Sequence, residues 1–117
     1  MAKVILANAF SLSMLKPEHV KQGVQIFIKE LSIEEVKELL SQGFESAIGH
    51  ESTAKILTQL LGVEVPTRRI MVTLEPEITL IVFQLMERLP EGKILTEREL
   101  QQLIERGKAK FFLVKIV

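Results

Sequence analysis

A histidine among small and hydroxyl-bearing residues is the first feature of this sequence that could do chemistry. Residues 46–53 are Ser-Ala-Ile-Gly-His-Glu-Ser-Thr, and an apolar pattern typical of a helix follows. The free N–H groups at the start of a helix attract phosphate, and Ser52 and Thr53 would add hydroxyl donors. His50 is suited to donate a proton to a leaving oxygen there. The alternative is that Ser46 or Ser52 merely caps the helix and that His50 is a solvated surface residue.

Polar side chains also stand at two places where apolar runs predict strands. Residues 8–13, Asn-Ala-Phe-Ser-Leu-Ser, follow the apolar run 4–7, and ligands of open sheets collect beyond strand ends. An ordinary Asx or Ser turn would explain the same residues. Gln84 interrupts the apolar run 78–86, and a buried polar group requires a partner or a ligand.

Two groups of charged residues offer contacts to phosphate. Arg68 and Arg69 open a run of alternating polarity, and guanidinium groups suit bidentate phosphate binding. A surface pair on an exposed strand face is the alternative. Arg88 and Glu91 lie in an expected loop around Pro90. They would form a local ion pair, which stabilises little at a protein surface.

The apolar pattern that must position these residues predicts one α+β domain over residues 1–117. Capping boxes begin two of the expected helices, with Glu35 three residues after Ser32 and Glu99 three after Thr96. The mixed order of elements predicts a five-stranded mixed sheet with about three helices packed on it. Strand edges in so small a domain favour a homodimer. Strands are expected at residues 4–7, 24–28, 69–74, 78–86 and 111–117, the third and fourth forming a hairpin, and helices between Ser32 and Gly43, ahead of Gly62, and between Thr96 and Gly107.

Composition excludes several classes of function. The chain of 117 residues has no cysteine and two histidines, which excludes disulfides, cysteine-based zinc sites, a thiol nucleophile and a three-histidine metal site within one chain. The 15 Lys and Arg residues are balanced by 15 Asp and Glu residues. Because binding to duplex DNA depends on a basic excess, we expect no duplex DNA partner. No signal sequence or membrane span is expected, which predicts a cytoplasmic protein with no membrane partner.

In order and spacing, these segments resemble the small ring-nuclease family of archaeal viruses, known as type III anti-CRISPR proteins, with its phage and cellular relatives. The resemblance extends over nearly the whole chain apart from about residues 16–42. Each motif is short, and their joint occurrence in order makes the resemblance specific. The matching stretches are residues 8–11, residues 46–50 with Ser52 and Thr53, Arg69, and residues 88–95, Arg-Leu-Pro-Glu-Gly-Lys-Ile-Leu.

The resemblance implies a function that the residues alone do not indicate. Members of the family bind cyclic tetra-adenylate, the second messenger that type III CRISPR systems make after detecting foreign RNA, on the two-fold axis of a homodimer. They cut the ring without a metal or another cofactor, in the host cytoplasm where the protein is viral, and so switch off the defence nucleases that the ring activates. By position, His50 would be the general acid, with Arg88 and Glu91 as the supporting catalytic pair. The ligand contacts would be Asn8, Ser11, Ser13, Gly49, Ser52, Thr53, Arg69 and Gln84.

Two positions depart from the family pattern. Ser13 stands where viral relatives carry Asn, and its shorter side chain would lose a hydrogen bond or leave it to water. Arg68 stands where an uncharged amide is common, and it would add a phosphate contact or none. Two other functions stay open, namely a protein that sequesters the cyclic nucleotide without cleaving it, and a viral dimer that binds DNA or protein.

Overall fold

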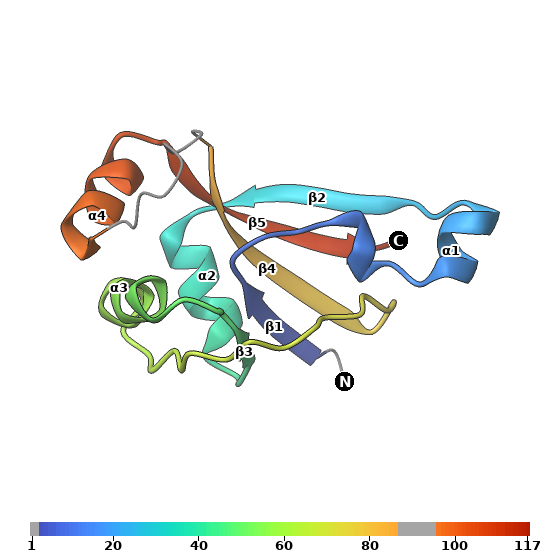
Figure 1. Cartoon of the computed structure of the whole chain (residues 1–117), viewed down its shortest axis with the longest axis horizontal. Helices are drawn as coiled ribbons and strands as arrows, with labels where there is room; N and C mark the ends of the chain where they lie inside the picture. Colours follow the sequence, from blue (N-terminus) through green and yellow to red (C-terminus); the bar gives the residue numbers. More distant parts are fainter. Residues whose placement is uncertain (1–2, 87–95) are drawn as a thin grey trace.

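A mixed five-stranded sheet runs through the middle of the molecule (Figure 1). The computed structural model describes residues 3–86 and 96–117. The strand order is β2-β5-β4-β1-β3, in which β1 is parallel to β3 and β4, and β5 is antiparallel to β4 and β2. The predicted five-stranded mixed sheet is therefore confirmed. Its strands are β1 (Lys3–Ala7), β2 (Ile26–Leu31), β3 (Glu45–Ala47), β4 (Ile78–Leu85) and β5 (Ala109–Ile116).

The central strand β4 is buried on both faces. Its residues are buried from Ile78 to Phe83 and half-buried at Gln84 and Leu85. A strand that is buried on both faces loses the alternation of apolar and polar residues that marks a strand with one solvated face. The central strand predicted at residues 78–86 is confirmed. Gln84 lies near its C-terminal end, where the side chains become partly exposed.

Three helices pack on one face of the sheet. They bury Val36, Leu57 and Leu100 in a core shared with Leu6 and Phe83 of the sheet. The three predicted helices are confirmed as α2 (Ile33–Leu40), α3 (Glu51–Leu61) and α4 (Glu97–Glu105). Among residues 3–86 and 96–117, no helix is long and apolar enough to cross a membrane.

The two predicted capping boxes are both present. The Ser32 hydroxyl accepts a hydrogen bond from the Glu35 N–H at 3.1 Å, and the Glu35 carboxylate accepts one from the Ser32 N–H at 3.0 Å. At α4, the Thr96 hydroxyl accepts from the Glu99 N–H at 3.2 Å. These reciprocal bonds satisfy N–H groups that a helix cannot pair internally.

Two largely irregular segments cover the opposite face of the sheet. The first, between β1 and β2, includes a 3-10 turn (Leu12–Met14) and the short α1 (Pro17–Gln22). The second, residues 62–77, joins α3 to β4. The segments meet where Leu15 pairs with Leu74 in an isolated bridge and the Leu74 N–H donates to the Met14 carbonyl at 2.7 Å. Leu15 and Leu74 are buried in a second core beneath these segments.

The prediction of a strand at residues 69–74, forming a hairpin with the next strand, is wrong. Among the described residues, this segment has one isolated bridge, at Leu74, and the bridge at Thr67 lies before it. Val72 is buried but Met71 is 93% exposed, so the alternation reflects packing of single side chains on the second core. The fifth strand is instead β3, whose sequence Glu-Ser-Ala carries no β-branched residue that would indicate a strand.

Removing the hydroxyl of the α2 capping box is expected to destabilise the protein. Ser32→Ala leaves the Glu35 N–H without its partner at 3.1 Å, and loss of such a cap typically costs about 1 kcal/mol. We expect the free energy of unfolding in urea to fall by about that amount. Ser41→Ala is the matched control at the other end of α2. The Ser41 hydroxyl donates to the Glu38 carbonyl, but this carbonyl also accepts from the Ser41 N–H and keeps a partner when the hydroxyl is removed. Equal losses in both variants would contradict the capping role.

The ion pair between Lys16 and Glu75 joins the two irregular segments and predicts a pH dependence. The hydrogen bond from Lys16 lowers the pKa of Glu75 below 4.5, and the same bond raises the pKa of Lys16 above 10.5. Stability from a lowered carboxyl pKa is present above the unfolded value and is lost as pH falls through the folded one. Glu75→Gln should therefore lower the Tm at pH 7 but not at pH 2. Glu64→Gln is the control and should have the Tm of wild type at both pH values. A Glu75→Gln variant with the Tm of wild type at both pH values would contradict the role of the ion pair.

Candidate functional site

The parallel strands β1, β3 and β4 end at one edge of the sheet and bring most of the predicted site together. The register places Ala7 of β1 level with Ala47 of β3 and with Val82 of β4. The chain therefore leaves β1 at Asn8 and β3 at Ile48 side by side. Ligands of open sheets gather at this edge, beyond the carboxyl ends of the strands.

His50 occupies the N-cap position of α3 without using its side chain to cap the helix. Its carbonyl accepts the Ala54 N–H at 3.0 Å, whereas its imidazole makes no capping hydrogen bond and is exposed. The half-buried Ser52 and Thr53 lie in the first turn of α3, where N–H groups lack partners within the helix. An exposed imidazole thus stands beside unpaired N–H groups, an arrangement suited to a phosphate ester.

The alternative in which Ser46 or Ser52 caps α3 is wrong. His50 is the N-cap residue, and Ser52 lies within the helix. The buried Ser46 hydroxyl instead donates to the Pro66 carbonyl at 2.6 Å and accepts from the Ile48 N–H at 3.3 Å. Ser46 therefore joins β3 to the segment after α3 and has a structural role.

Arg69 is held against Gly49, next to His50. The Arg68 N–H donates to the Ile48 carbonyl at 2.7 Å, which aligns the two segments. The Arg69 Nε–H then donates to the Gly49 carbonyl at 3.3 Å. A Cβ at position 49 would lie 3.1 Å from the Arg69 Cγ, so glycine permits this close approach. The exposed guanidinium lies beside the start of α3. Its other N–H groups make no hydrogen bond to the described residues.

The segment after β1 lies over Gln84. Phe10 and Gln84 line one cavity of about 200 Å³, together with Met86 and Phe112. The Gln84 amide nitrogen donates to the Leu85 carbonyl at 3.2 Å, which leaves the amide oxygen available to a ligand. The hydroxyls of Ser11 and Ser13 are hydrogen-bonded to each other at 2.6 Å and are exposed. Phe112, which sequence reasoning did not select, reaches the site only through the pairing of β5 with β4.

Arg88 and Glu91 lie outside the described residues, so their predicted roles stay predictions. In the sequence they follow soon after Met86, the last residue that the structure describes before residue 96. The other predicted residues fall into two groups on the same edge of the sheet. The first group, around the start of α3, is Gly49, His50, Ser52, Thr53 and Arg69, and the second, around the end of β1 and β4, is Asn8, Ser11, Ser13 and Gln84.

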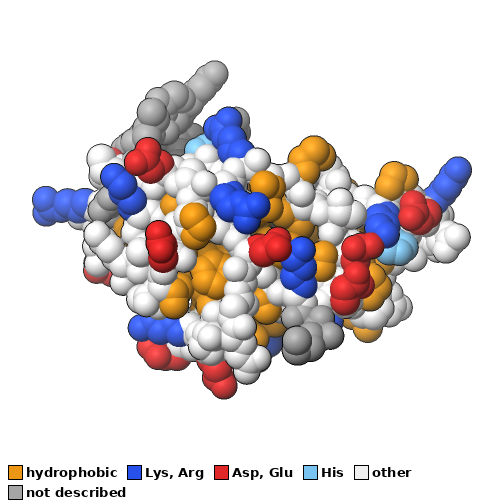
Figure 2. All heavy atoms as spheres, turned by 90° about the horizontal axis from the view of Figure 1, so that it is seen from below, with side chains coloured by type: hydrophobic (Ala, Val, Ile, Leu, Met, Phe, Trp, Pro, Cys, Tyr) orange, Lys and Arg blue, Asp and Glu red, His pale blue; other side chains and the backbone are white. Residues whose placement is uncertain are grey.

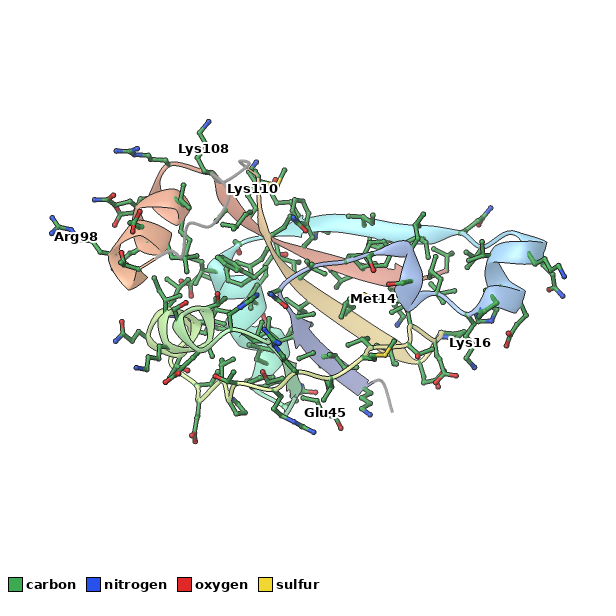
Figure 3. All side chains as sticks on the ribbon, viewed as in Figure 1. Met14, Lys16, Glu45, Arg98, Lys108 and Lys110 are labelled. Carbon is green, nitrogen blue, oxygen red and sulfur yellow. The ribbon has the colours of Figure 1, made fainter. Side chains whose placement is uncertain are left out.

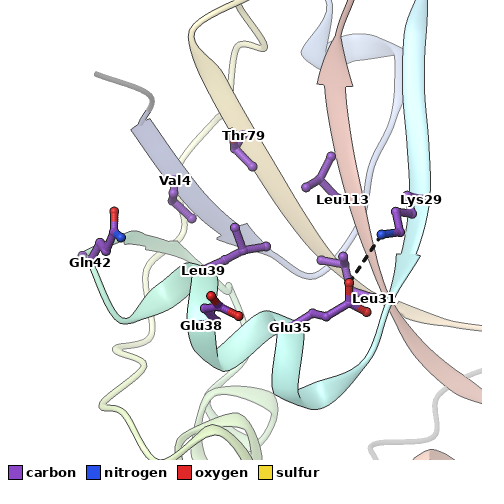
Figure 4. A pocket seen from close by; sticks show the side chains of 10 residues that line it. Val4, Lys29, Leu31, Glu35, Glu38, Leu39, Gln42, Thr79 and Leu113 are labelled. Carbon is purple, nitrogen blue, oxygen red and sulfur yellow. Dashed lines mark hydrogen bonds and ion pairs between the residues drawn. The ribbon is translucent and has the colours of Figure 1, made fainter.

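A larger cavity on the helix-covered face is lined by none of the predicted site residues that the structure describes. It has a volume of about 680 Å³ and lies between α2 and the sheet (Figure 4). Its floor is apolar, with Val4, Leu39 and Leu113, and the Lys29–Glu35 ion pair at 3.4 Å spans its rim. The Glu38 carboxylate also lines this cavity, so the rim carries two carboxylates against one ammonium and does not suit phosphate.

Two viral proteins are similar to this chain in sequence. The chain is 49% identical over 80 residues to "Uncharacterized protein 26" of Sulfolobus islandicus filamentous virus, covering 67% of this chain and 68% of that protein. It is 30% identical over 111 residues to "Uncharacterized protein ORF116" of Acidianus filamentous virus 1, covering 95% of this chain and 93% of that protein.

The fold is shared with a solved viral protein. B116 of Sulfolobus turreted icosahedral virus (STIV) matches with a TM-score of 0.74 and 30% identity, covering 97% of this chain and 99% of that chain. Residues 4–111 match the family described as STIV B116-like. The relatives from filamentous viruses share its sequence, B116 also shares its architecture, and the chain belongs to the STIV B116-like family.

Proposed function

We propose that this protein is a metal-independent ring nuclease that binds cyclic tetra-adenylate, cleaves it and so ends type III CRISPR signalling. The observation that carries the proposal is the exposed His50 imidazole at the start of α3, with the Arg69 guanidinium held beside it through Gly49. These groups supply a proton donor, a cation and free N–H groups for one phosphate. The motif resemblance supplies the identity of the ring.

The chemistry needs a proton donor for the leaving oxygen, an acceptor for the 2′-OH proton and accurate positioning. The ribose 2′-OH attacks the adjacent phosphorus in line with the 5′-oxygen and gives up its proton to water or, as the alternative role of Glu91, to that carboxylate, so the P–O2′ bond forms as the P–O5′ bond breaks. His50, as imidazolium, donates its proton to the leaving 5′-oxygen. Arg88 would stabilise the charge of the phosphorane, and Glu91 would orient Arg88. The products are linear adenylates with a 5′-OH and a 2′,3′-cyclic phosphate.

The remaining predicted residues would hold the ring. Arg69 binds a phosphate with its free N–H groups, and the first turn of α3 adds the hydroxyls of Ser52 and Thr53. Gln84 offers its amide oxygen to a base or a ribose. Asn8, Ser11, Ser13 and Gly49 complete the contacts along the end of β1 and the turn into α3.

A homodimer would complete the site. Apolar side chains around the 200 Å³ cavity are unusually exposed, with Ile28 56% and Met86 53% accessible. Exposed apolar surface next to a polar site favours association. Two copies related by a two-fold axis would present two His50 residues to one ring, and two opposite cuts would give two dinucleotides.

The charge distribution fits local neutralisation of the ring. Lys and Arg side chains are mixed with Asp and Glu side chains over the face shown in Figure 2, and the chain as a whole has zero net charge. The ring carries four phosphates, and Arg69 and Arg88 from two protomers would supply four guanidinium groups. Such a site needs no general basic excess, whereas binding along duplex DNA does.

Replacing His50 is expected to abolish cleavage and spare binding. In EDTA, under single-turnover conditions with radiolabelled ring, His50→Ala should slow cleavage by about 10²- to 10⁴-fold, because the leaving oxygen loses its proton donor. His19→Ala is the control, since His19 lies on α1. Unchanged cleavage by His50→Ala would contradict the general-acid role.

The same time course separates the proposed enzyme from its alternatives. Wild-type protein should convert the ring to dinucleotides. Binding without cleavage would indicate a protein that sequesters the nucleotide. Absence of both would reject the cyclic nucleotide as ligand and favour the DNA- or protein-binding dimer. Opening at one bond only, with no dinucleotide at completion, would contradict two-fold symmetric cleavage.

Replacing Arg69 is expected to weaken binding of the ring. Arg69→Met removes a charge-assisted hydrogen bond, typically about 1.5–3 kcal/mol, which corresponds to about 10- to 100-fold in Kd. The dependence of Kd on salt should also become shallower, because fewer counterions are released. Arg98→Met is the control, since Arg98 extends from α4 away from the sheet (Figure 3). Equal affinity and equal salt dependence in the two variants would contradict the phosphate contact.

A further inference from the structure

Lys110 lies directly opposite Gln84 in the sheet. The antiparallel ladder of β4 and β5 pairs Gln84 with Lys110 and Val82 with Phe112. Residues opposite each other in such a ladder share a face and have Cβ atoms about 4.5–5.5 Å apart. Gln84, Val82 and Phe112 line the 200 Å³ cavity, so Lys110 continues the same face at its end. Figure 3 shows Lys110 at the start of β5, near the end of β4.

Glu30 holds the Lys110 ammonium on this face. The Lys110 Nζ lies 3.3 Å from the Glu30 Oε1. Glu30 is paired with Phe112 in the ladder of β2 and β5, so the ion pair runs diagonally across these strands on the cavity side. The side chains are 37% and 58% exposed, respectively. An exposed pair of this kind stabilises little, and the ammonium is therefore available to a phosphate.

The groups around the cavity match the parts of a nucleotide. Phe10 and Phe112 offer aromatic rings for a base, and stacking of this kind contributes about 1–3 kcal/mol per base. Gln84 offers an amide, and Lys110 a cation at one end of the apolar surface. The group around the start of α3 (Gly49, His50, Ser52, Thr53 and Arg69) includes no phenylalanine. The two groups of site residues thus differ in chemistry, because one combines an imidazole with a guanidinium and the other places two phenyl rings beside an ammonium.

We propose that Lys110 is a phosphate-binding residue of the nucleotide site, contacting the phosphate of an adenylate whose base lies against Phe10 and Phe112. This inference rests on the proposed function. Binding exchanges the carboxylate of Glu30 for a phosphate oxygen at the Lys110 ammonium. Each protomer then binds the ring through two separate cations of its described part, Arg69 and Lys110.

Affinity measurements with a matched pair of lysines test this assignment. Lys110→Met should raise the Kd for cyclic tetra-adenylate by about 5- to 30-fold and make its salt dependence shallower. Lys110→Arg keeps the charge and should bind within about twofold of the parent. Lys29→Met is the control: Lys29 also forms a solvent-accessible pair, with Glu35 at 3.4 Å, but it lines the cavity on the opposite face of the sheet. Isothermal titration calorimetry with a 2′-fluoro ring, which lacks the nucleophile, measures binding without cleavage.

The outcomes separate this inference from the proposed function. Loss of affinity in Lys110→Met alone, with recovery in Lys110→Arg, supports the assignment. If the parent binds the ring and Lys110→Met binds it equally well, Lys110 is not a phosphate contact and the proposed function stands. If Lys29→Met weakens binding of the ring as much as Lys110→Met does, the loss reflects the net charge of the protein, and the assignment is overturned. A parent that binds no ring would overturn both proposals.

Discussion

The parallel pairing of β1 with both β3 and β4 is the constraint on which the candidate site depends. Because Ala7 lies level with Ala47 and Val82, three chain segments leave the sheet at one edge. A shift of one residue in this register would turn every side chain of β1 to the other face. The buried Ile5 and Leu6, which belong to different cores, make such a shift costly. The apolar packing of β1 therefore fixes the position of polar residues that contribute little to stability.

The two faces of the sheet are covered in different ways. Helices with capping boxes cover one face and bury continuous apolar surface there. The other face is covered by irregular segments joined through Leu15, Leu74 and the Lys16–Glu75 ion pair. Irregular segments leave backbone and side-chain groups exposed, and this is where binding residues can be placed without loss of core. Arg69 and Ser11 both lie on these segments, while His50 lies between a strand and a helix.

Local sequence patterns predicted the elements whose signals are local. The capping boxes at Ser32 and Thr96 correctly identified α2 and α4, and the long apolar run correctly identified β4. Each of these signals depends on residues within a few positions of one another. The alternation around Val72 was misleading, since its side chain packs on a core built by distant residues. The strand β3 escaped detection because its burial comes from pairing with β1 and from the Ser46–Pro66 hydrogen bond.

The candidate site was predictable to a similar degree. Polar residues at strand ends and at the start of α3 indicated a phosphate site, and the motif resemblance indicated its ligand. The contact of Arg69 with Gly49 needed the structure, because it joins segments that α3 separates. Lys110 carried no signal in the sequence: its relation to Gln84 exists only in the register of β4 and β5.

The central claim is that the exposed imidazole at the start of α3 contacts the bound ring. The chain has two histidines, His50 at this site and His19 on α1, so imidazole ¹H–¹⁵N spectra carry their own control. Titration with the 2′-fluoro ring should shift the His50 resonances until the site is saturated and leave those of His19 unchanged. Saturable binding with no change at His50, or with equal changes at both histidines, would contradict the account.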